Sequence, residues 1–130
     1  MVTHFKELKV WQKGMMLVKE VYLFTKVFPK DEMFGLASQI RRSAVSVVSN
    51  IAEGAAREST KDFLRFLSMT RGSLAELETQ ILIALDLEYV SEAKKILEMM
   101  DEVSRMVNGL QKALEEKLTT HHSSLATLEE

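Results

Sequence analysis

The stretch that decides the fold is Gln39-Ile40-Arg41-Arg42-Ser43-Ala44-Val45-Ser46-Val47-Val48-Ser49-Asn50-Ile51-Ala52-Glu53-Gly54. It carries two stripes at the three- and four-residue spacing that brings side chains onto one face of a helix. The apolar stripe is Ile40, Ala44, Val47 and Ile51, and the polar stripe is Gln39, Arg42, Ser46, Asn50 and Glu53. Short polar side chains replace the long Lys and Glu of an ordinary solvent-exposed face. The pattern predicts a helix that approaches a neighbour closely along a hydrogen-bonded polar seam.

The same spacing extends in both directions and predicts long helices at about residues 8–28, 31–54, 60–86 and 91–118. Two apolar stripes run side by side along the first of them. One consists of Leu8, Trp11, Met15, Val18, Tyr22 and Thr25, and the other of Val10, Gly14, Leu17, Val21, Phe24 and Phe28. A helix in a bundle needs only about one apolar stripe to face the core. The excess predicts that a second subunit covers part of this helix.

Local signals mark the ends of these helices. Pro29 ends the first, because proline lacks the backbone N–H that a helix interior needs. Asp31 and Glu32 are expected in the first turn of the second, where carboxylates favour the positive end of the helix. Gly54 is expected to supply a left-handed residue at its end. Ser59, followed three residues later by an acidic residue, predicts the N-cap of the third helix.

The third and fourth helices have heptad spacing. The apolar positions are Phe63, Leu67, Thr70, Leu74, Leu77, Ile81 and Ala84 in the third and Ile96, Met100, Val103, Val107, Leu110 and Leu114 in the fourth. Gly72 lies in the middle of the third helix and predicts a close backbone contact there. Ser91 is expected to cap the fourth. With short connectors, these helices predict an all-α, antiparallel up-down-up-down four-helix bundle over residues 1–118. Residues 119–130 are expected to form a polar C-terminal tail, either a frayed helix end or disordered.

Composition limits the functional classes. The chain has 130 residues, enough for about one domain, and no cysteine, which excludes disulfides and thiolate metal sites. It has no apolar signal core and no run of the roughly 18 apolar residues that a membrane span needs, so a cytoplasmic protein is expected. The net charge is −2, but residues 1–75 carry +5 and residues 76–130 carry −7. The two halves are expected to attract each other within or between subunits, or the first half faces an anionic partner.

Six blocks of sequence, in order, resemble a known family. They are Phe5-x-x-Leu8-x-Val10-Trp11-Gln12-Lys13, Phe28-Pro29-x-x-Glu32, Leu36-x-x-Gln39-Ile40-Arg41-Arg42-Ser43-x-x-Ser46, Asn50-Ile51-Ala52-Glu53-Gly54, Phe63-x-x-Phe66-Leu67 and Gly72-Ser73-x-x-Glu76. Over about residues 5–115 the chain resembles the bacterial four-helix bundle proteins named for reading frames inserted in 23S ribosomal RNA genes, the intervening-sequence proteins. The resemblance implies a homopentamer packed as a barrel, with no established activity for most members. One relative, the accessory protein of diversity-generating retroelements, binds nucleic acid and a reverse transcriptase.

Two groups of residues are candidates for function. The first is an arginine group on the second and third helices, Arg41, Arg42, Arg57, Arg65 and Arg71. These side chains either contact nucleic-acid phosphates or pair with nearby carboxylates within or between subunits. The second group is a polar set of Gln39, Ser46, Asn50 and Glu53 with Ser73 and Glu76 on the facing helix. This set either forms a structural network that fixes helix register or lines a ligand pocket or the channel of an oligomer.

Neither a metal site nor catalytic machinery is expected. The histidines, His4, His121 and His122, fall outside the predicted helix cores, unlike the Glu-x-x-His pairs of di-iron bundles. No phosphate-binding glycine loop or nucleophile elbow is present. We therefore expect no cofactor and a non-enzymatic, self-associating helical bundle that acts as a scaffold or adaptor, with an unknown protein partner. The alternative is an RNA- or DNA-binding protein that uses the arginines.

Overall fold

The structure is a computed structural model that describes residues 4–129, with side chains for residues 4–120. Over that range the fold is all-α, as the sequence predicts, with four α-helices, two short 3-10 helices and no strand. The 3-10 helices are η1 (Phe5–Glu7) and η2 (Lys30–Glu32), and the α-helices are α1 (Lys9–Thr25), α2 (Leu36–Ala55), α3 (Thr60–Asp86) and α4 (Lys94–Glu129).

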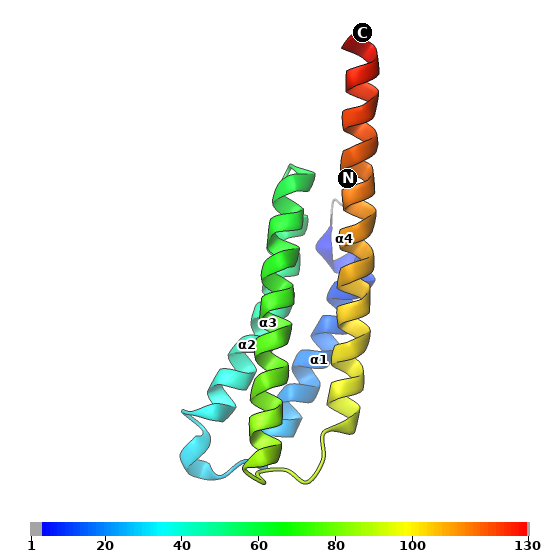
Figure 1. Ribbon diagram of the computed structural model, residues 1–130. Helices are drawn as coiled ribbons and strands as arrows, with labels where there is room; N and C mark the ends of the chain where they lie inside the picture. Colours follow the sequence, from blue (N-terminus) through cyan, green and yellow to red (C-terminus); the bar gives the residue numbers. More distant parts are fainter. Residues whose placement is uncertain (1–3, 130) are drawn as a thin grey trace.

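The chain reverses direction at each connector, so that consecutive helices lie side by side (Figure 1). Both α1 and α3 pack against α2 and α4. Contacts at both ends fix the register of α2 and α3. Ser43, near the start of α2, meets Gln80 near the end of α3, whereas Gly54, near the end of α2, meets Phe66 near the start of α3. At the end of the bundle where α2 connects to α3, α4 extends beyond the other helices (Figure 1).

The core forms where the apolar stripes meet. Ile40, Ala44, Val47 and Ile51 of α2 are fully buried, as predicted. The whole predicted stripe of α3 is buried, and so are the first four positions of the stripe of α4, whereas Leu110 and Leu114 are only partly covered. Burial of these side chains is the main source of stability, at roughly 25 cal/mol for each Å² of apolar surface removed from water.

The two stripes of α1 have different environments. Val10, Gly14, Leu17 and Val21 face the core and are buried. In the neighbouring stripe Met15 is 43% exposed and Tyr22 is 40% exposed. One subunit therefore covers the second stripe only in part: Thr25 is buried, whereas Met15 and Tyr22 leave apolar surface exposed.

Glycines allow close helix contacts at two positions. A Cβ atom added at Gly14 would lie 2.6 Å from Val48 Cγ1, and one added at Gly54 would lie 2.7 Å from Phe66 Cβ. The prediction that Gly54 adopts a left-handed conformation is wrong, because none of the five glycines, all in the described part of the chain, has a positive φ. Instead, the missing side chain lets α2 approach α3. At Gly72 an added Cβ would have no neighbour within 4 Å in the described chain, so the predicted close contact is not made within one subunit.

The first turn of α2 begins later than predicted. Pro29 is followed by η2, and α2 starts at Leu36 rather than near residue 31. Asp31 and Glu32 therefore lie in the 3-10 turn. The Glu32 carboxylate nevertheless serves α2, because its Oε1 accepts a hydrogen bond of 3.3 Å from the Leu36 N–H. This contact supplies a partner for one of the unpaired N–H groups at a helix start.

The predicted start of α3 is confirmed, whereas the predicted start and end of α4 are wrong. Ser59 caps α3 as predicted, since its Oγ accepts a hydrogen bond of 3.0 Å from the Asp62 N–H. The cap predicted at Ser91 is wrong, because α4 starts at Lys94, whose N–H donates to Glu92 Oε2. The backbone of residues 119–129 continues α4 instead of forming a separate tail. No proline or glycine follows Gly109 to end the helix.

Candidate functional site

Arg41 lies between α2 and α1 and is occupied by contacts within the chain. Its Nε donates a hydrogen bond of 2.8 Å to Oγ1 of the buried Thr25. Its guanidinium carbon lies 4.6 Å from the centre of the Tyr22 ring, within the range of a cation–π contact. Arg41 therefore fixes the contact between these two helices.

Two other arginines share one aromatic ring at the turn between α2 and α3. The guanidinium carbons of Arg57 and Arg65 lie 4.9 Å and 4.8 Å from the centre of the Phe66 ring. Arg65 is also 3.7 Å from Asp62 in an exposed ion pair, which contributes little to stability. Both guanidinium groups thus contact the same ring.

The structure does not gather the five predicted arginines into one site. Arg41 and Arg57 are separated by the length of α2, roughly 24 Å at 1.5 Å per residue. Arg42 is exposed near the start of α2, and Arg71 points toward α4, where it donates a hydrogen bond of 3.3 Å to Gln111. Only Arg57 and Arg65 form a local pair.

The predicted polar set lies mainly on the outside of the subunit. Gln39, Glu53 and Glu76 are exposed, and Ser46, Asn50 and Ser73 are partly buried. The Asn50 side chain donates to the backbone oxygen of Ser46 in its own helix, at 2.9 Å. Among the described residues no hydrogen bond from this set links α2 to α3. A network that joins the set between subunits stays a prediction.

A different polar seam connects α2 and α3 inside the core. Ser43 Oγ donates a hydrogen bond of 2.9 Å to Gln80 Oε1, and both residues are buried. Thr70 Oγ1 lies 3.4 Å from the backbone oxygen of Val47. The sequence analysis did not single out Gln80. The available signal was Ser43, a polar residue three positions after Ile40 at the edge of the apolar stripe, which would need a buried partner.

Tyr89, in the connector between α3 and α4, is a second residue that the sequence did not indicate. Its phenolic oxygen donates a hydrogen bond of 2.6 Å to Glu32 Oε2. That bond, with burial and the negative charges of Glu32 and Asp31, raises the pKa of Tyr89 above its ordinary value. The Tyr89 ring also contacts Phe28, at 5.5 Å between ring centres.

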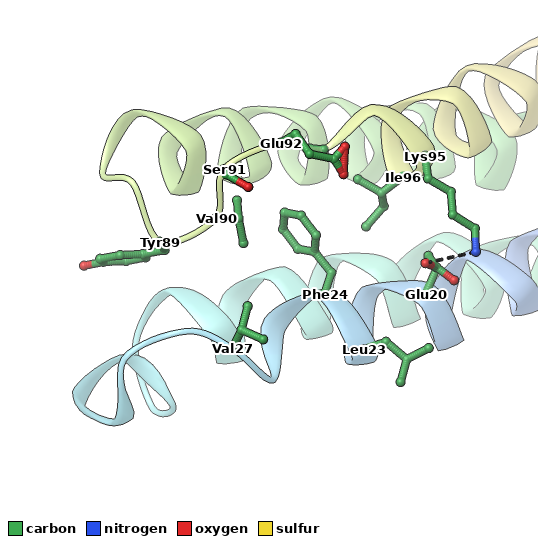
Figure 2. A pocket seen from close by; sticks show the side chains of 11 residues that line it. Glu20, Leu23, Phe24, Val27, Tyr89, Val90, Ser91, Glu92, Lys95 and Ile96 are labelled. Atoms are coloured by element: carbon green, nitrogen blue, oxygen red, sulfur yellow. Dashed lines mark ion pairs between the residues drawn. The ribbon is translucent and has the colours of Figure 1, made fainter.

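A groove of about 520 Å³ lies between α1 and the start of α4, and we call it the α1–α4 groove. It is lined by Glu20, Leu23, Phe24 and Val27 of α1 and the segment after it, and by Tyr89, Val90, Ser91, Glu92, Ala93, Lys95 and Ile96. Figure 2 shows the side chains of Phe24 and Ile96 directed toward each other across the groove. At one end, Lys95 Nζ lies 3.4 Å from Glu20 Oε1. The groove thus has an apolar floor and a charged rim.

A second depression, of about 490 Å³, lies over α1 and α2, and we call it the α1–α2 patch. It is lined by Tyr22, Met33, Phe34, Ser38, Arg41, Arg42 and Val45. Phe34 is 98% exposed, an unusual environment for a phenylalanine. The patch combines apolar side chains with two arginines.

Features of other functional classes are missing from the described part of the chain. There, no group of three or more His, Asp and Glu side chains is placed to hold a metal ion. His121 and His122 lie outside the residues whose side chains are described. Among the described helices, none is both long and apolar enough for a membrane span.

Fold and surface together define a helical-bundle protein with apolar and cationic surface side chains. A family model described as 23S rRNA-intervening sequence protein matches residues 6–109, and the chain belongs to that family, whose function is not established. A crystal structure of a protein with unknown function from the S23 ribosomal protein family of Bacteroides thetaiotaomicron superposes with a TM-score of 0.59. It is 22% identical and covers 81% of this chain and 94% of that one, so it supports the fold alone. No curated protein matches the sequence.

Proposed function

We propose that this protein is a non-enzymatic, self-associating scaffold or adaptor of the cytoplasm. Its subunit is an antiparallel up-down-up-down bundle, and five subunits assemble as a homopentameric barrel around which protein partners are arranged. The number five follows from the resemblance to the intervening-sequence proteins, whereas self-association is supported by the surface of this chain.

The observation that carries the proposal is the apolar surface over α1 and α2. Tyr22, Met33, Phe34 and Val45 line one continuous depression, and Met15 continues the exposed stripe of α1. Large contiguous apolar patches are rare on monomers and typical of interaction surfaces. Burial of this surface against another copy would remove it from water.

Light scattering after size-exclusion chromatography tests self-association. We expect one species at micromolar concentration with about five times the 14.8 kDa mass of the chain. Val45→Lys, within the α1–α2 patch, should reduce the mass of the species. Leu82→Lys is a matched control, because Leu82 has similar exposure but lies on α3, away from the patch. A wild-type mass of one chain at every concentration would overturn the proposal.

Nucleic-acid binding is the second candidate function, and the Arg57–Arg65 pair on Phe66 favours it. Two guanidinium groups that are both positioned by one ring offer preorganised contacts to phosphate oxygens. Binding through such contacts weakens steeply as the salt concentration rises. Lys61, exposed in the first turn of α3, adds a third positive charge to this end of the bundle.

Fluorescence anisotropy with a structured RNA and a DNA duplex, at low and moderate salt, tests this second candidate. We expect a salt-sensitive complex that Arg57→Ala/Arg65→Ala weakens at least tenfold. Arg105→Ala is the matched control, because Arg105 is exposed on α4 and paired with Asp101. Absence of binding by the wild type at low salt would reject this candidate and leave the scaffold proposal intact.

A further inference from the structure

Phe34 projects from the turn that precedes α2 and is 98% exposed. A phenylalanine that becomes buried in a pocket can contribute strongly to an interface, because a few well-buried large side chains carry most of the binding energy. Phe34 is therefore suited to insert into a complementary cavity on another molecule.

The α1–α4 groove has a matching apolar lining. Phe24 and Ile96 form its floor, and Val27, at its edge, is 70% exposed. Within one chain Val27 and part of Phe24 remain open to solvent, whereas Ile96 is only 2% exposed. A single aromatic ring entering between Phe24 and the connector would cover the floor and remove Val27 from water.

The charges around Phe34 and around the groove are opposite. Arg42 is exposed beside Phe34 in the α1–α2 patch and forms no ion pair among the described residues. Glu92 is exposed on the rim of the groove, where its carboxylate accepts only the 3.4 Å hydrogen bond from the Lys94 N–H in the described chain. Lys95, the cation of the rim, is already paired with Glu20. Phe34 in the groove would therefore bring an unpaired cation toward an unpaired anion.

A symmetric contact between two α1–α2 patches is less favourable. It would place Arg41 and Arg42 of one copy against the same arginines of the other, and like charges across an interface are repulsive. A contact between patch and groove avoids that repulsion. It is heterologous, because two different surfaces of the chain meet.

The positions of the two surfaces allow such a contact to close into a ring. The α1–α2 patch and the α1–α4 groove lie on opposite sides of α1, on adjacent faces of the bundle. Adjacent faces of a bundle with a square cross-section point about 90° apart. Because the two surfaces face different directions, each heterologous contact turns the next subunit relative to the last, as closure into a ring requires.

We infer that Phe34 of one copy inserts into the α1–α4 groove of the next copy, with Arg42 facing Glu92, and that this contact repeats around the oligomer. This inference rests on the proposed self-association and assigns its interface. Both surfaces belong to the same chain, so every subunit provides one Phe34 and one groove.

Site-directed cross-linking tests the contact directly, because the chain has no cysteine of its own. Ser38→Cys places a thiol beside Phe34, and Ser91→Cys places one on the rim of the groove. The two variants carry tags of different mass, are co-expressed, and are treated with a short bismaleimide. We expect a cross-linked product that contains both tags and that disappears when Phe34→Ala is added. Ser68→Cys, exposed on α3, replaces Ser91→Cys as the control and should give no product with Ser38→Cys.

Phe34→Ala is also expected to raise the dissociation constant of the oligomer by about 30-fold, the usual effect of losing a central contact residue. At concentrations where wild type and variant are both dissociated, the thermal unfolding midpoint should not change, since Phe34 is almost fully exposed within one chain. Leu82→Ala should leave the dissociation constant unchanged.

The outcomes separate this inference from the proposed function. A wild-type oligomer that gives no Ser38–Ser91 product, or that cross-links Ser38 to Ser38, would overturn the Phe34 contact and leave self-association standing. An equal effect of Leu82→Ala would likewise overturn it. A wild-type protein that is monomeric at every concentration would overturn both.

Discussion

Tyr89 Oη donates a hydrogen bond of 2.6 Å to Glu32 Oε2, across 57 positions of sequence. Glu32 Oε1 accepts a second bond, from the Leu36 N–H at the start of α2. One carboxylate therefore joins the turn before α2 to the connector between α3 and α4. The adjacent residue Glu88 has a φ of 61°, a left-handed conformation that ends α3 and directs the chain toward this contact.

Removal of the Tyr89 hydroxyl should destabilise the fold. Tyr89→Phe keeps the ring contact with Phe28 but leaves Glu32 Oε2 without its donor. We expect a lower midpoint of urea unfolding for Tyr89→Phe. Tyr22→Phe is the matched control, because the Tyr22 hydroxyl forms no hydrogen bond among the described residues. Equal midpoints for the two variants would contradict a structural role for the Tyr89–Glu32 bond.

The same bond predicts a dependence of stability on alkaline pH. The hydrogen bond to Glu32 is the largest contribution to the raised pKa of Tyr89 in the folded state. A raised pKa means that the folded state holds the phenol proton more tightly than the unfolded chain does. The stabilisation is therefore complete below the unfolded tyrosine pKa of about 10 and is lost as the pH rises through the higher folded value.

Urea unfolding at a series of pH values from neutral to strongly alkaline measures this effect. The wild type should lose more stability above pH 10 than Tyr89→Phe does, because the variant has no proton to release at that position. Glu32→Gln should lower the pKa of Tyr89 in a spectroscopic titration, since it removes the negative charge. Identical alkaline slopes for wild type and Tyr89→Phe would argue against the linkage.

The sequence predicted the helices because apolar spacing is a local signal. Ile40, Ala44, Val47 and Ile51 repeat at intervals that only a helix places on one face, and all four are buried. Ser59 was found in the same way, because an N-cap and its acidic partner are three residues apart. The first residues of α2 and α4 were less predictable. They depend on which side chain accepts a hydrogen bond from the first free backbone N–H group, Glu32 for Leu36 and Glu92 for Lys94.

The functional surfaces were only partly predictable. The excess of apolar residues on α1 predicted cover by a second subunit. Met15 and Tyr22 are exposed within one chain, and their cover by another subunit stays a prediction. The arginine set was predicted as one hairpin site, whereas tertiary contacts direct Arg41 to Thr25 and Arg71 to Gln111. The partners of Tyr89 and Gln80 are distant in sequence, and no local spacing indicates them.

Substitution of two glycines by alanine should distinguish the effect of a close contact between helices from the effect of intrinsic helix propensity on stability. Gly54→Ala would place a Cβ 2.7 Å from Phe66 Cβ and 2.9 Å from Phe63 Cδ1, so α2 and α3 would have to move apart. We expect a loss of about 1–3 kcal/mol in the free energy of unfolding, the usual range for overpacking. Gly72→Ala meets no atom within 4 Å in the described chain and should stabilise α3 by up to about 1 kcal/mol. Chemical denaturation measures both, and a neutral Gly54→Ala would contradict the close contact.

The Ser43–Gln80 hydrogen bond should matter most when only one partner is removed. Ser43→Ala leaves the buried Gln80 amide oxygen without its donor, at a cost of about 1–3 kcal/mol in the free energy of unfolding. Gln80→Leu leaves the Ser43 hydroxyl without its acceptor and should also lower the free energy of unfolding.

Ser43→Ala/Gln80→Leu removes both polar groups from the interface between α2 and α3. The double variant should therefore be more stable than the sum of the single losses predicts, and a double-mutant cycle by urea unfolding measures the difference. Strictly additive losses would show that the two side chains do not interact, and the register of α2 on α3 would then depend on apolar packing and on the close approach at Gly54.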